Sequence, residues 1–339
     1  MIKNLNTLKL MVAIAVLFAT VSCGSDKPKK IRIGFAMDTY TEERWKKDAE
    51  FFKQKIEALG GEVEVQACNG NEQVQNQQIE NFITKQVDLI LIVPHNSKTC
   101  ATAVKQANEA NIPIIAYDRM IKDCDISMYI SFDNEKVGEM QATYATQVAP
   151  KGNYLLAGGS ATDENAILYR KGQMNILQPF VDKGEIKILI DQFCKDWLPV
   201  EALKLTQNAL TLSNNNIAAI VVANDGLAGG CIQALTEQQL QGKVPVTGQD
   251  AEISAIQRIL DGTQSMTVYK PVKILAETAA EVAMGLVKKT STIAETKKMN
   301  NGVKDVPSIL LTPVMVTKEN IEATVIKDGY IDKSKLKFQ

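Results

Sequence analysis

The sequence contains a single histidine, His95, among its 339 residues. His-based Ser or Cys triads, H-E-x-x-H zinc sites and most histidine-rich metal centres are therefore excluded. Blocks of like charge are also absent, since 38 Lys and Arg face 39 Asp and Glu for a formal net charge of -1. This balance argues against a nucleic-acid-binding surface.

Sequence motifs for nucleotide, metal and nucleophile chemistry are missing as well. The six cysteines, at positions 23, 68, 100, 124, 194 and 231, include no C-x-x-C pair and match no zinc or iron–sulfur spacing. No Walker A sequence occurs, and residues 158–162 (GGSAT) lack the second flanking glycine of a nucleophile elbow. We therefore expect no cofactor, no metal and no enzymatic activity. With 45% hydrophobic and 23% charged residues, the chain has the composition of a soluble globular protein.

The N-terminal segment has the features of an export signal. Two lysines precede an almost wholly apolar run at 10–21, which is shorter than the ~20 residues that a membrane-spanning helix needs. Small residues then lead into Cys23, as in the lipobox of bacterial lipoproteins. We expect a signal peptide at 1–22, lipid attachment at Cys23 and a tether at 23–30, which places the protein outside the cytoplasm, in the periplasm and anchored to a membrane. An ordinary signal with an incidental Cys23 is the alternative.

Short apolar runs rich in Val and Ile alternate with stretches of helical periodicity. Continuous hydrophobicity of this kind is typical of parallel strands buried on both faces. The expected strands are 31–36, 63–67, 87–93, 112–117, 128–132, 154–157, 186–190, 217–223, 244–247 and 266–269, and helices are expected at 45–59, 71–85, 99–110, 134–148 and 200–212. The alternation predicts an α/β fold with doubly wound parallel sheets. Ten strands are too many for one core of this type, so we expect two similar domains that divide near Phe132.

Polar side chains gather after the predicted strands, where open α/β sheets bind ligands. The candidates are Arg44, Trp45, Asp118, Arg119, Asn165, Arg170, Trp197, Asn224, Asp250 and Lys270. The set suits a neutral polyol: carboxylates accept hydrogen bonds from hydroxyls, while Arg, Asn and Lys donate them. A Trp face covers the apolar side of a sugar ring. The sequence therefore predicts a sugar-binding site.

Other roles for these residues remain open at this point. Any one strand-end Asp, Arg or Asn can be a helix cap or a surface ion pair, and Trp45 lies on the apolar face of its helix, where it can belong to the core. Asp118 and Asp250 could form a glycosidase pair. However, the neighbouring Arg and Lys residues predict lowered pKa values for both carboxyls, which disfavours a general acid.

Several longer motifs in the sequence resemble those of a known protein family. They are ERW at 43–45, NGNE at 69–72, YDRM at 117–120, YISFDNEKVGE at 129–139, GQD at 248–250, MTVYKP at 266–271 and NNGVKDVPS at 300–308. From about Ile31 to its end, the chain resembles the D-xylose-binding branch of the type I periplasmic binding protein family, which serves ABC sugar importers. The segment at 38–41 departs from the pattern of that branch.

The resemblance implies a fold and a function. Two similar domains are joined by a multi-strand hinge, and the ligand lies in the interdomain cleft. The expected domains are 31–132 plus about 270–298, and 133–269 plus about 299–339. Trp45 and Trp197 would stack on the sugar, and the other eight candidates would hydrogen-bond to it. We expect a monomer that binds D-xylose or a closely related monosaccharide and delivers it to the permease of an ABC transporter. The alternative is a sugar-sensing co-receptor for a membrane histidine kinase or chemoreceptor.

Overall fold

The computed structural model describes residues 30–290 and 297–338. The expected signal peptide, most of the tether and the lipid attachment at Cys23 lie outside these residues. The chain from Ile31 onward forms one unit, and all geometry below belongs to it. Among the described residues, no helix combines the length and apolar character needed to cross a membrane.

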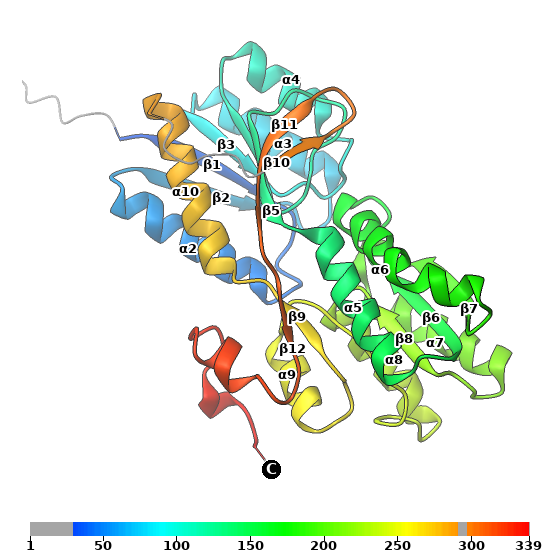
Figure 1. The fold of residues 1–339 in the computed structure, drawn as a ribbon. Coiled ribbons are helices and arrows are strands. Elements are labelled where there is room, and N and C mark those ends of the chain that lie inside the picture. Colours follow the sequence, from blue (N-terminus) through cyan, green and yellow to red (C-terminus); the bar gives the residue numbers. More distant parts are fainter. Residues whose placement is uncertain (1–29, 291–296, 339) are drawn as a thin grey trace, which may run out of the picture. The chain divides into compact units, whose positions relative to one another are not determined.

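Five strands from the first half of the chain and two from residues 297–311 build a seven-stranded sheet in the order β10-β11-β5-β4-β3-β1-β2, parallel except for β10 (Figure 1). Its strands are β1 (Arg32–Met37), β2 (Glu62–Ala67), β3 (Leu89–Ile92), β4 (Ile114–Tyr117), β5 (Met128–Phe132), β10 (Lys297–Asn300) and β11 (Asp305–Leu311). Helices α2 (Arg44–Ala58) and α10 (Val272–Lys288) cover one face, and α3 (Glu72–Thr84) and α4 (Ala101–Glu109) cover the other.

Alternation along the strands explains why both faces of this sheet are buried. In β1, Phe35 and Met37 pack with α2 and α10, whereas Ala36 between them packs with α3 and α4. Successive side chains of a strand point to opposite faces, so a strand with helices on both sides must be apolar throughout. The continuous apolar runs of the sequence therefore mark these strands.

The second sheet is smaller and has the parallel order β7-β6-β8. Its strands are β6 (Gly152–Gly158), β7 (Ile186–Phe193) and β8 (Ala219–Val222), and Val246 extends it through a parallel bridge to Ile220. Helices α5 (Asn134–Val148) and α6 (Glu164–Asp182) pack on one face, and α7 (Pro199–Ser213) and α8 (Asp225–Glu237) pack on the other. A single turn of 3-10 helix, η1 (Lys195–Trp197), connects β7 to α7.

The chain passes between the two sheets at three places: from β5 into α5, from β9 (Thr267–Tyr269) into α10, and from β11 into β12 (Val314–Val316). β9 and β12 pair with each other as an antiparallel ribbon. The ribbon packs with α9 (Ile253–Leu260) and with the C-terminal segment, which contains the turns η2 (Glu322–Ile326) and η3 (Lys333–Lys335). The three connections correspond to the expected multi-strand hinge.

The α/β class and the parallel sheets agree with the sequence-based expectation, and nine of the ten expected strands are present. At the tenth position, 244–247, only Val246 pairs, through its isolated bridge to Ile220. Strands β10, β11 and β12 are not among the expected ones. The expected domain limits differ from the structure at one place. Residues 299–311 were assigned to the second domain, but β10 and β11 belong to the seven-stranded sheet. The reason is that Ser308–Leu311 pair in parallel with Tyr129–Phe132, a long-range contact that no local pattern signals.

Candidate functional site

A cavity with an empty volume of about 270 Å³ lies beyond the carboxyl ends of strands from both sheets. It is lined by Glu42, Arg44, Trp45, Asp118, Arg119, Asp163, Asn165, Tyr169, Trp197, Asn224, Gln249, Asp250 and Lys270. Every predicted site residue except Arg170 is among them.

Arg44 connects carboxylates from both sides of the cavity. It is the first residue of α2 and is buried at 3% exposure. Its guanidinium donates to Asp118 at 2.8 Å and to Asp48 at 3.1 Å, and it lies 3.8 Å from the carboxylate of Asp250. Burial alone would lower the pKa of Arg44, but these three carboxylates raise it well above its ordinary value. Arg44 is therefore a fixed cation at the floor of the site.

Asp118 follows β4 and has the backbone of a left-handed residue, with φ 61°. Its carbonyl oxygen accepts hydrogen bonds from Ser131 at 2.6 Å and Tyr129 at 3.1 Å, which hold this conformation. Burial would raise the pKa of its carboxyl, but Arg44, Lys270 and Arg119 lower it to about 2. Asp118 therefore stays ionised and serves as a hydrogen-bond acceptor, as predicted.

Asp250 departs from that prediction. Its backbone also lies in the left-handed half of conformational space, at φ 104°. Its carboxylate accepts from the side-chain amide of Gln249. Burial raises the pKa of Asp250 to about 6, and the more distant cations Arg44 and Lys270 do not reverse this. The expectation of lowered pKa values for both carboxyls is wrong here, because burial outweighs an ion pair as long as 3.8 Å.

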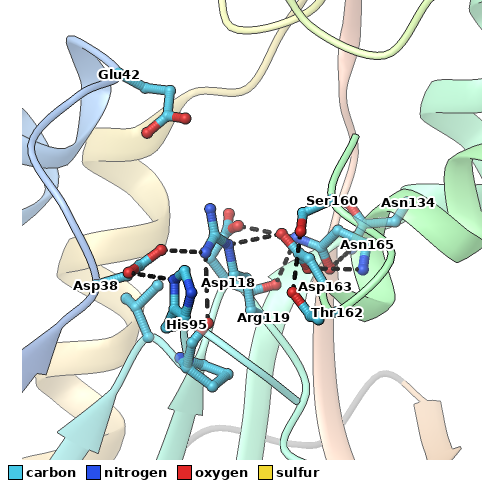
Figure 2. Close-up of polar contacts among 12 residues, drawn as sticks. Asp38, Glu42, His95, Asp118, Arg119, Asn134, Ser160, Thr162, Asp163 and Asn165 are labelled. Carbon is cyan, nitrogen blue, oxygen red and sulfur yellow. Dashed lines mark hydrogen bonds and ion pairs between the residues drawn. The ribbon is translucent and has the colours of Figure 1, made fainter. Parts of the chain in front are cut away.

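Arg119 is held between two carboxylates, one beside the larger sheet and one beside the smaller sheet (Figure 2). Its Nη1 donates to Asp38 at 2.7 Å, and its Nε forms a 2.8 Å ion pair with Asp163. Asp38 follows β1 and also pairs with Nδ1 of His95 at 2.9 Å. Burial opposes the charge of Arg119, but Asp163 and Asp38 raise its pKa. In the closed cleft the guanidinium is thus held from both sides.

The two tryptophans line the cavity in different surroundings. Trp45 is 3% exposed, packs with the core of the seven-stranded sheet, and donates its indole N–H to Glu42 at 2.8 Å. Trp45 therefore lines the cavity and also belongs to the core.

Trp197 lies at the end of η1 with φ 58° and is 9% exposed. A Cβ on residue 159 would lie 2.1 Å from its ring, so only glycine permits this close approach. Its indole nitrogen is buried and has no hydrogen-bond partner in the described structure. Buried donors usually have partners, so this N–H is available to a ligand hydroxyl.

Helix α6 presents Asn165 and Tyr169 to the cavity, one turn apart. The Asn165 amide donates to the Asp118 carboxylate at 3.0 Å, and the Tyr169 hydroxyl accepts from Lys270 at 3.0 Å. Arg170 follows Tyr169, so it points ~100° further around the helix axis.

Arg170 accordingly contacts other groups. Its guanidinium contacts Gln173 and Asp191 and lies 5.5 Å from the ring centroid of Phe193. The prediction that Arg170 binds the ligand is not supported, because its position on the helix turns it toward β7.

Asn224 and Lys270 complete the donor set. The side-chain oxygen of Asn224 caps α8 by accepting from the backbone N–H of Leu227 at 2.9 Å, which leaves its amide group as the donor toward a ligand. Lys270 is 2% exposed, and its ammonium lies 3.5 Å from the Asp118 carboxylate. Burial lowers the pKa of Lys270 although Asp118 opposes this.

Sequence reasoning missed four residues of the cavity: Glu42, Asp163, Tyr169 and Gln249. For two of them the sequence contains a signal of a place in the site. Tyr169 is four residues after Asn165, the spacing of one helix face, and Gln249 precedes Asp250 at the end of a predicted strand. Asp163 caps α6 by accepting from the backbone N–H of Asn165 at 2.9 Å, and such a cap carries no sign of a binding role. We find no signal for Glu42.

The walls of the cavity meet directly around its edge. The backbone N–H of Ser97 donates to the carbonyl of Thr162 at 2.9 Å, and Lys122 donates to Glu164 at 3.2 Å. The cleft is therefore closed. Within residues 30–290 and 297–338, no group of three or more His, Cys, Asp or Glu residues is arranged to hold a metal. The cavity offers paired charges and hydrogen-bonding groups, which suits a small neutral polar ligand.

Comparisons with known proteins agree with this geometry. The chain is 53% identical over 308 residues to the D-xylose-binding periplasmic protein of Escherichia coli, covering 91% of this chain and 93% of that protein. It is 47% identical to the protein of the same name from Haemophilus influenzae, covering 94% and 95%. These relatives are named as binding proteins and not as enzymes, as predicted.

A solved structure extends the comparison to the fold. The carbohydrate transporter solute binding protein from Chloroflexus aurantiacus, in complex with D-glucose, superposes with a TM-score of 0.84 at 30% identity, covering 91% of this chain and 99% of that one. The family model described as periplasmic binding protein domain matches residues 33–291. Its extent, together with the closed cleft between two parallel sheets, shows that the chain belongs to the periplasmic binding protein family.

Proposed function

We propose that the chain is a periplasmic solute-binding protein that closes on D-xylose and delivers it to an ABC importer. The observation that carries the proposal is the cavity itself, where four carboxylates, three cations, three carboxamides and an unpartnered indole N–H converge. The names of the two most similar relatives reported above support D-xylose as the ligand.

Each group has a role that its chemistry suits. Asp118 and Asp250 accept hydrogen bonds from sugar hydroxyls, and Arg44, Arg119 and Lys270 donate to sugar oxygens. Hydrogen bonds to charged groups contribute ~1.5–3 kcal/mol each, so a few of them support micromolar or tighter binding. Asn165 and Asn224 supply amide donors. Trp45 and Trp197 cover the apolar faces of the ring.

Closure of the cleft is what a membrane partner would recognise. Asp118 and Asp250 are reached from opposite sides of the cavity, so a sugar that binds both favours the closed form. A ligand shifts an open–closed equilibrium by its difference in affinity for the two forms. An importing permease that binds the closed form therefore receives loaded protein preferentially.

A ligand panel tests the proposed specificity. The purified protein is heated with D-xylose, L-arabinose, D-ribose or D-glucose, and the unfolding midpoint is recorded. A ligand that binds only the native state raises the midpoint. We expect the largest rise with D-xylose. A larger rise with another sugar would contradict the proposed ligand.

Lipid attachment at Cys23 is the second part of the proposal. It rests on the short apolar run and the small residues before Cys23. Replacing Cys23 with Ala should move the protein from the membrane fraction to the soluble fraction. Unchanged partitioning would contradict the anchor, while sugar binding by the soluble variant should stay normal.

The membrane partner needs a separate experiment. Deleting the chain from its source cell should abolish high-affinity uptake of radiolabelled D-xylose, and uptake should return when the chain is supplied again. Normal uptake combined with a lost transcriptional or chemotactic response to D-xylose would instead indicate a sensing role. Sedimentation of the soluble Cys23→Ala protein should give the mass of a monomer with and without sugar.

A further inference from the structure

Asp250 occupies a backbone conformation that a non-glycine residue adopts only when its surroundings enforce it, with φ 104°, and Ala251 follows at φ 52°. Hydrogen bonds fix this turn. The Asp250 N–H donates to the carbonyl of Val268 at 2.9 Å, and the Ala251 N–H donates to the Thr267 hydroxyl at 3.2 Å. Both partners come from the neighbouring β9, so they secure one side of the turn.

Tyr330 holds the turn from another part of the chain. Its hydroxyl donates to the backbone carbonyl of Asp250 at 3.2 Å. Its ring packs on Tyr269, with ring centroids 4.9 Å apart. Tyr330 does not line the cavity, so its effect on the site is indirect, and Asp250 is the lining residue that its hydroxyl contacts.

Tyr330 is also contacted by a residue from the other side of the cleft. Lys47 donates to the Tyr330 carbonyl at 2.9 Å, and its ammonium lies 3.7 Å from the centroid of the Tyr330 ring. Lys47 is on α2, three residues after Arg44, whose guanidinium faces the Asp250 carboxylate at 3.8 Å. Helix α2 therefore approaches Asp250 twice, directly through Arg44 and indirectly through Lys47 and Tyr330.

We infer that Tyr330 is a positioning residue for the Asp250 carboxylate, and that its contact with Lys47 links this position to closure of the cleft. In the closed form, Lys47 holds Tyr330, which holds the Asp250 carbonyl and thereby aims the carboxylate. When the cleft opens, α2 withdraws and Lys47 releases Tyr330. The inference rests on the proposed function, since it gives Asp250 a ligand to meet.

The sharpest variant is Tyr330→Phe, which keeps the ring and its stacking with Lys47 and Tyr269 but removes the hydroxyl. Because the variant removes one hydrogen bond, the Kd for D-xylose should rise about three- to tenfold. The matched control is Tyr154→Phe. The Tyr154 hydroxyl also donates to a backbone carbonyl, that of Ala149 at 2.6 Å, but Tyr154 is not among the residues that line the cavity. The control should leave the Kd unchanged.

Two further measurements separate positioning from a merely structural role. In an Asp250→Asn background, Tyr330→Phe should change the Kd less than about twofold, because coupled residues are non-additive. Lys47→Met should speed sugar dissociation about three- to tenfold in stopped-flow fluorescence and leave the association rate unchanged. Lys53→Met, on the exposed face of the same helix, is its control and should change neither rate.

The wild-type protein is titrated first. If it does not bind D-xylose, the proposed function fails and this inference fails with it. If the wild type binds normally and Tyr330→Phe binds equally well, only the inference is overturned. It is also overturned if Tyr330→Phe weakens binding by the same factor with Asp250 and with Asn at position 250.

Discussion

The side-chain amide of Asn165 donates to both the carboxylate and the backbone carbonyl of Asp118, at 3.0 and 3.2 Å. Asn165 lies in the first turn of α6 beside the smaller sheet, and Asp118 directly follows β4 of the larger one. One amide therefore bridges the closed cleft and restricts the Asp118 carboxylate. Because this contact joins the two sides, it orders the carboxylate in the closed form, and affinity should depend strongly on the groups that hold it there.

Substitutions of the two tryptophans should have different effects, one on sugar affinity and the other on stability. D-xylose should change the fluorescence of the protein, because its two tryptophans both line the cavity. Trp197→Phe removes the unpartnered indole N–H and keeps most of the packing, so the Kd should rise at least tenfold while the midpoint of the sugar-free protein changes little. Trp45→Ala should instead cost ~3–5 kcal/mol of stability, as for other large core residues. The result would be contradicted by a stable Trp45→Ala protein or by unchanged sugar affinity in Trp197→Phe.

Asp250→Asn should weaken D-xylose binding at least tenfold, equivalent to ~1.4 kcal/mol. The substitution keeps the shape of the side chain and one acceptor oxygen but removes the charge that sugar hydroxyls meet. The sugar-free protein should unfold at the same or a higher temperature, because burial penalises the charge. Calorimetry measures the affinity, and Asp261→Asn on the exposed end of α9 is the control. If Asp250→Asn bound D-xylose with wild-type affinity, Asp250 would not be part of the binding site.

Binding should weaken as the pH falls through about 6, the value to which burial raises the pKa of Asp250. The sugar needs the carboxylate, so protonation competes with binding, and the Kd should rise about tenfold from pH 7 to pH 5. The effect of pH on folding stability through Asp250 has the opposite sign to its effect on sugar affinity. A raised folded pKa means that the native state holds the proton more tightly, so this contribution to stability is lost as the pH rises from about 4 to about 6. Asp118, with its pKa lowered to about 2, stays ionised throughout this range.

The same titrations on Asp250→Asn are the control for this prediction. His95 also has a raised pKa, caused first by its hydrogen bond to Asp38, so part of any pH dependence can come from it. The part that disappears in Asp250→Asn belongs to Asp250. An identical pH profile in both proteins would contradict the assignment.

Substitution of Tyr169, and not of the sequence-predicted Arg170, should weaken sugar binding. Tyr169→Phe removes a hydrogen-bond partner of Lys270 inside the cavity, so the Kd should rise about three- to tenfold. Arg170→Ala should leave the Kd within about twofold, because its guanidinium contacts Gln173 and Asp191 outside the cavity. Calorimetry on both variants checks this. If Arg170→Ala lost more affinity than Tyr169→Phe, the prediction would be wrong and Arg170 would belong to the binding site.

The strands and most of the site were predictable because both follow from short-range rules. A strand covered on both faces must be apolar, as residues 89–92 show, and the ends of parallel strands gather at one edge of each sheet. Asp118 and Asp250 follow predicted strands on the two sides of the cleft, and the folded chain brings both sides together around the cavity. The spacing of Tyr169 from Asn165 is a signal only where a helix is expected, and no helix is expected at 164–182, so Tyr169 was missed. Arg170 was misplaced because a step of one residue turns a helix side chain away from the cavity.

Other features depend on contacts between distant residues. The pairing of β11 with β5 assigns residues 305–311 to the seven-stranded sheet, and only the folded chain shows it. The pKa of Asp250 rises because the surrounding protein excludes water, which depends on packing and not on the neighbouring residues in sequence. The contacts of Tyr330 with Asp250 and Lys47 join positions 80 and 283 residues apart.

The left-handed backbone conformations of Asp118 and Asp250 cost folding stability at two positions where the side chain is proposed to bind the sugar. Non-glycine residues in such conformations cost ~1–3 kcal/mol each, a strain that glycine at either position would relieve. Glycine would also delete a carboxylate that the sugar needs. A library of variants selected for heat resistance alone should therefore accumulate glycine at these two positions and lose its ligand. Laboratory evolution of a more robust sugar sensor from this chain must select for binding and thermal stability together.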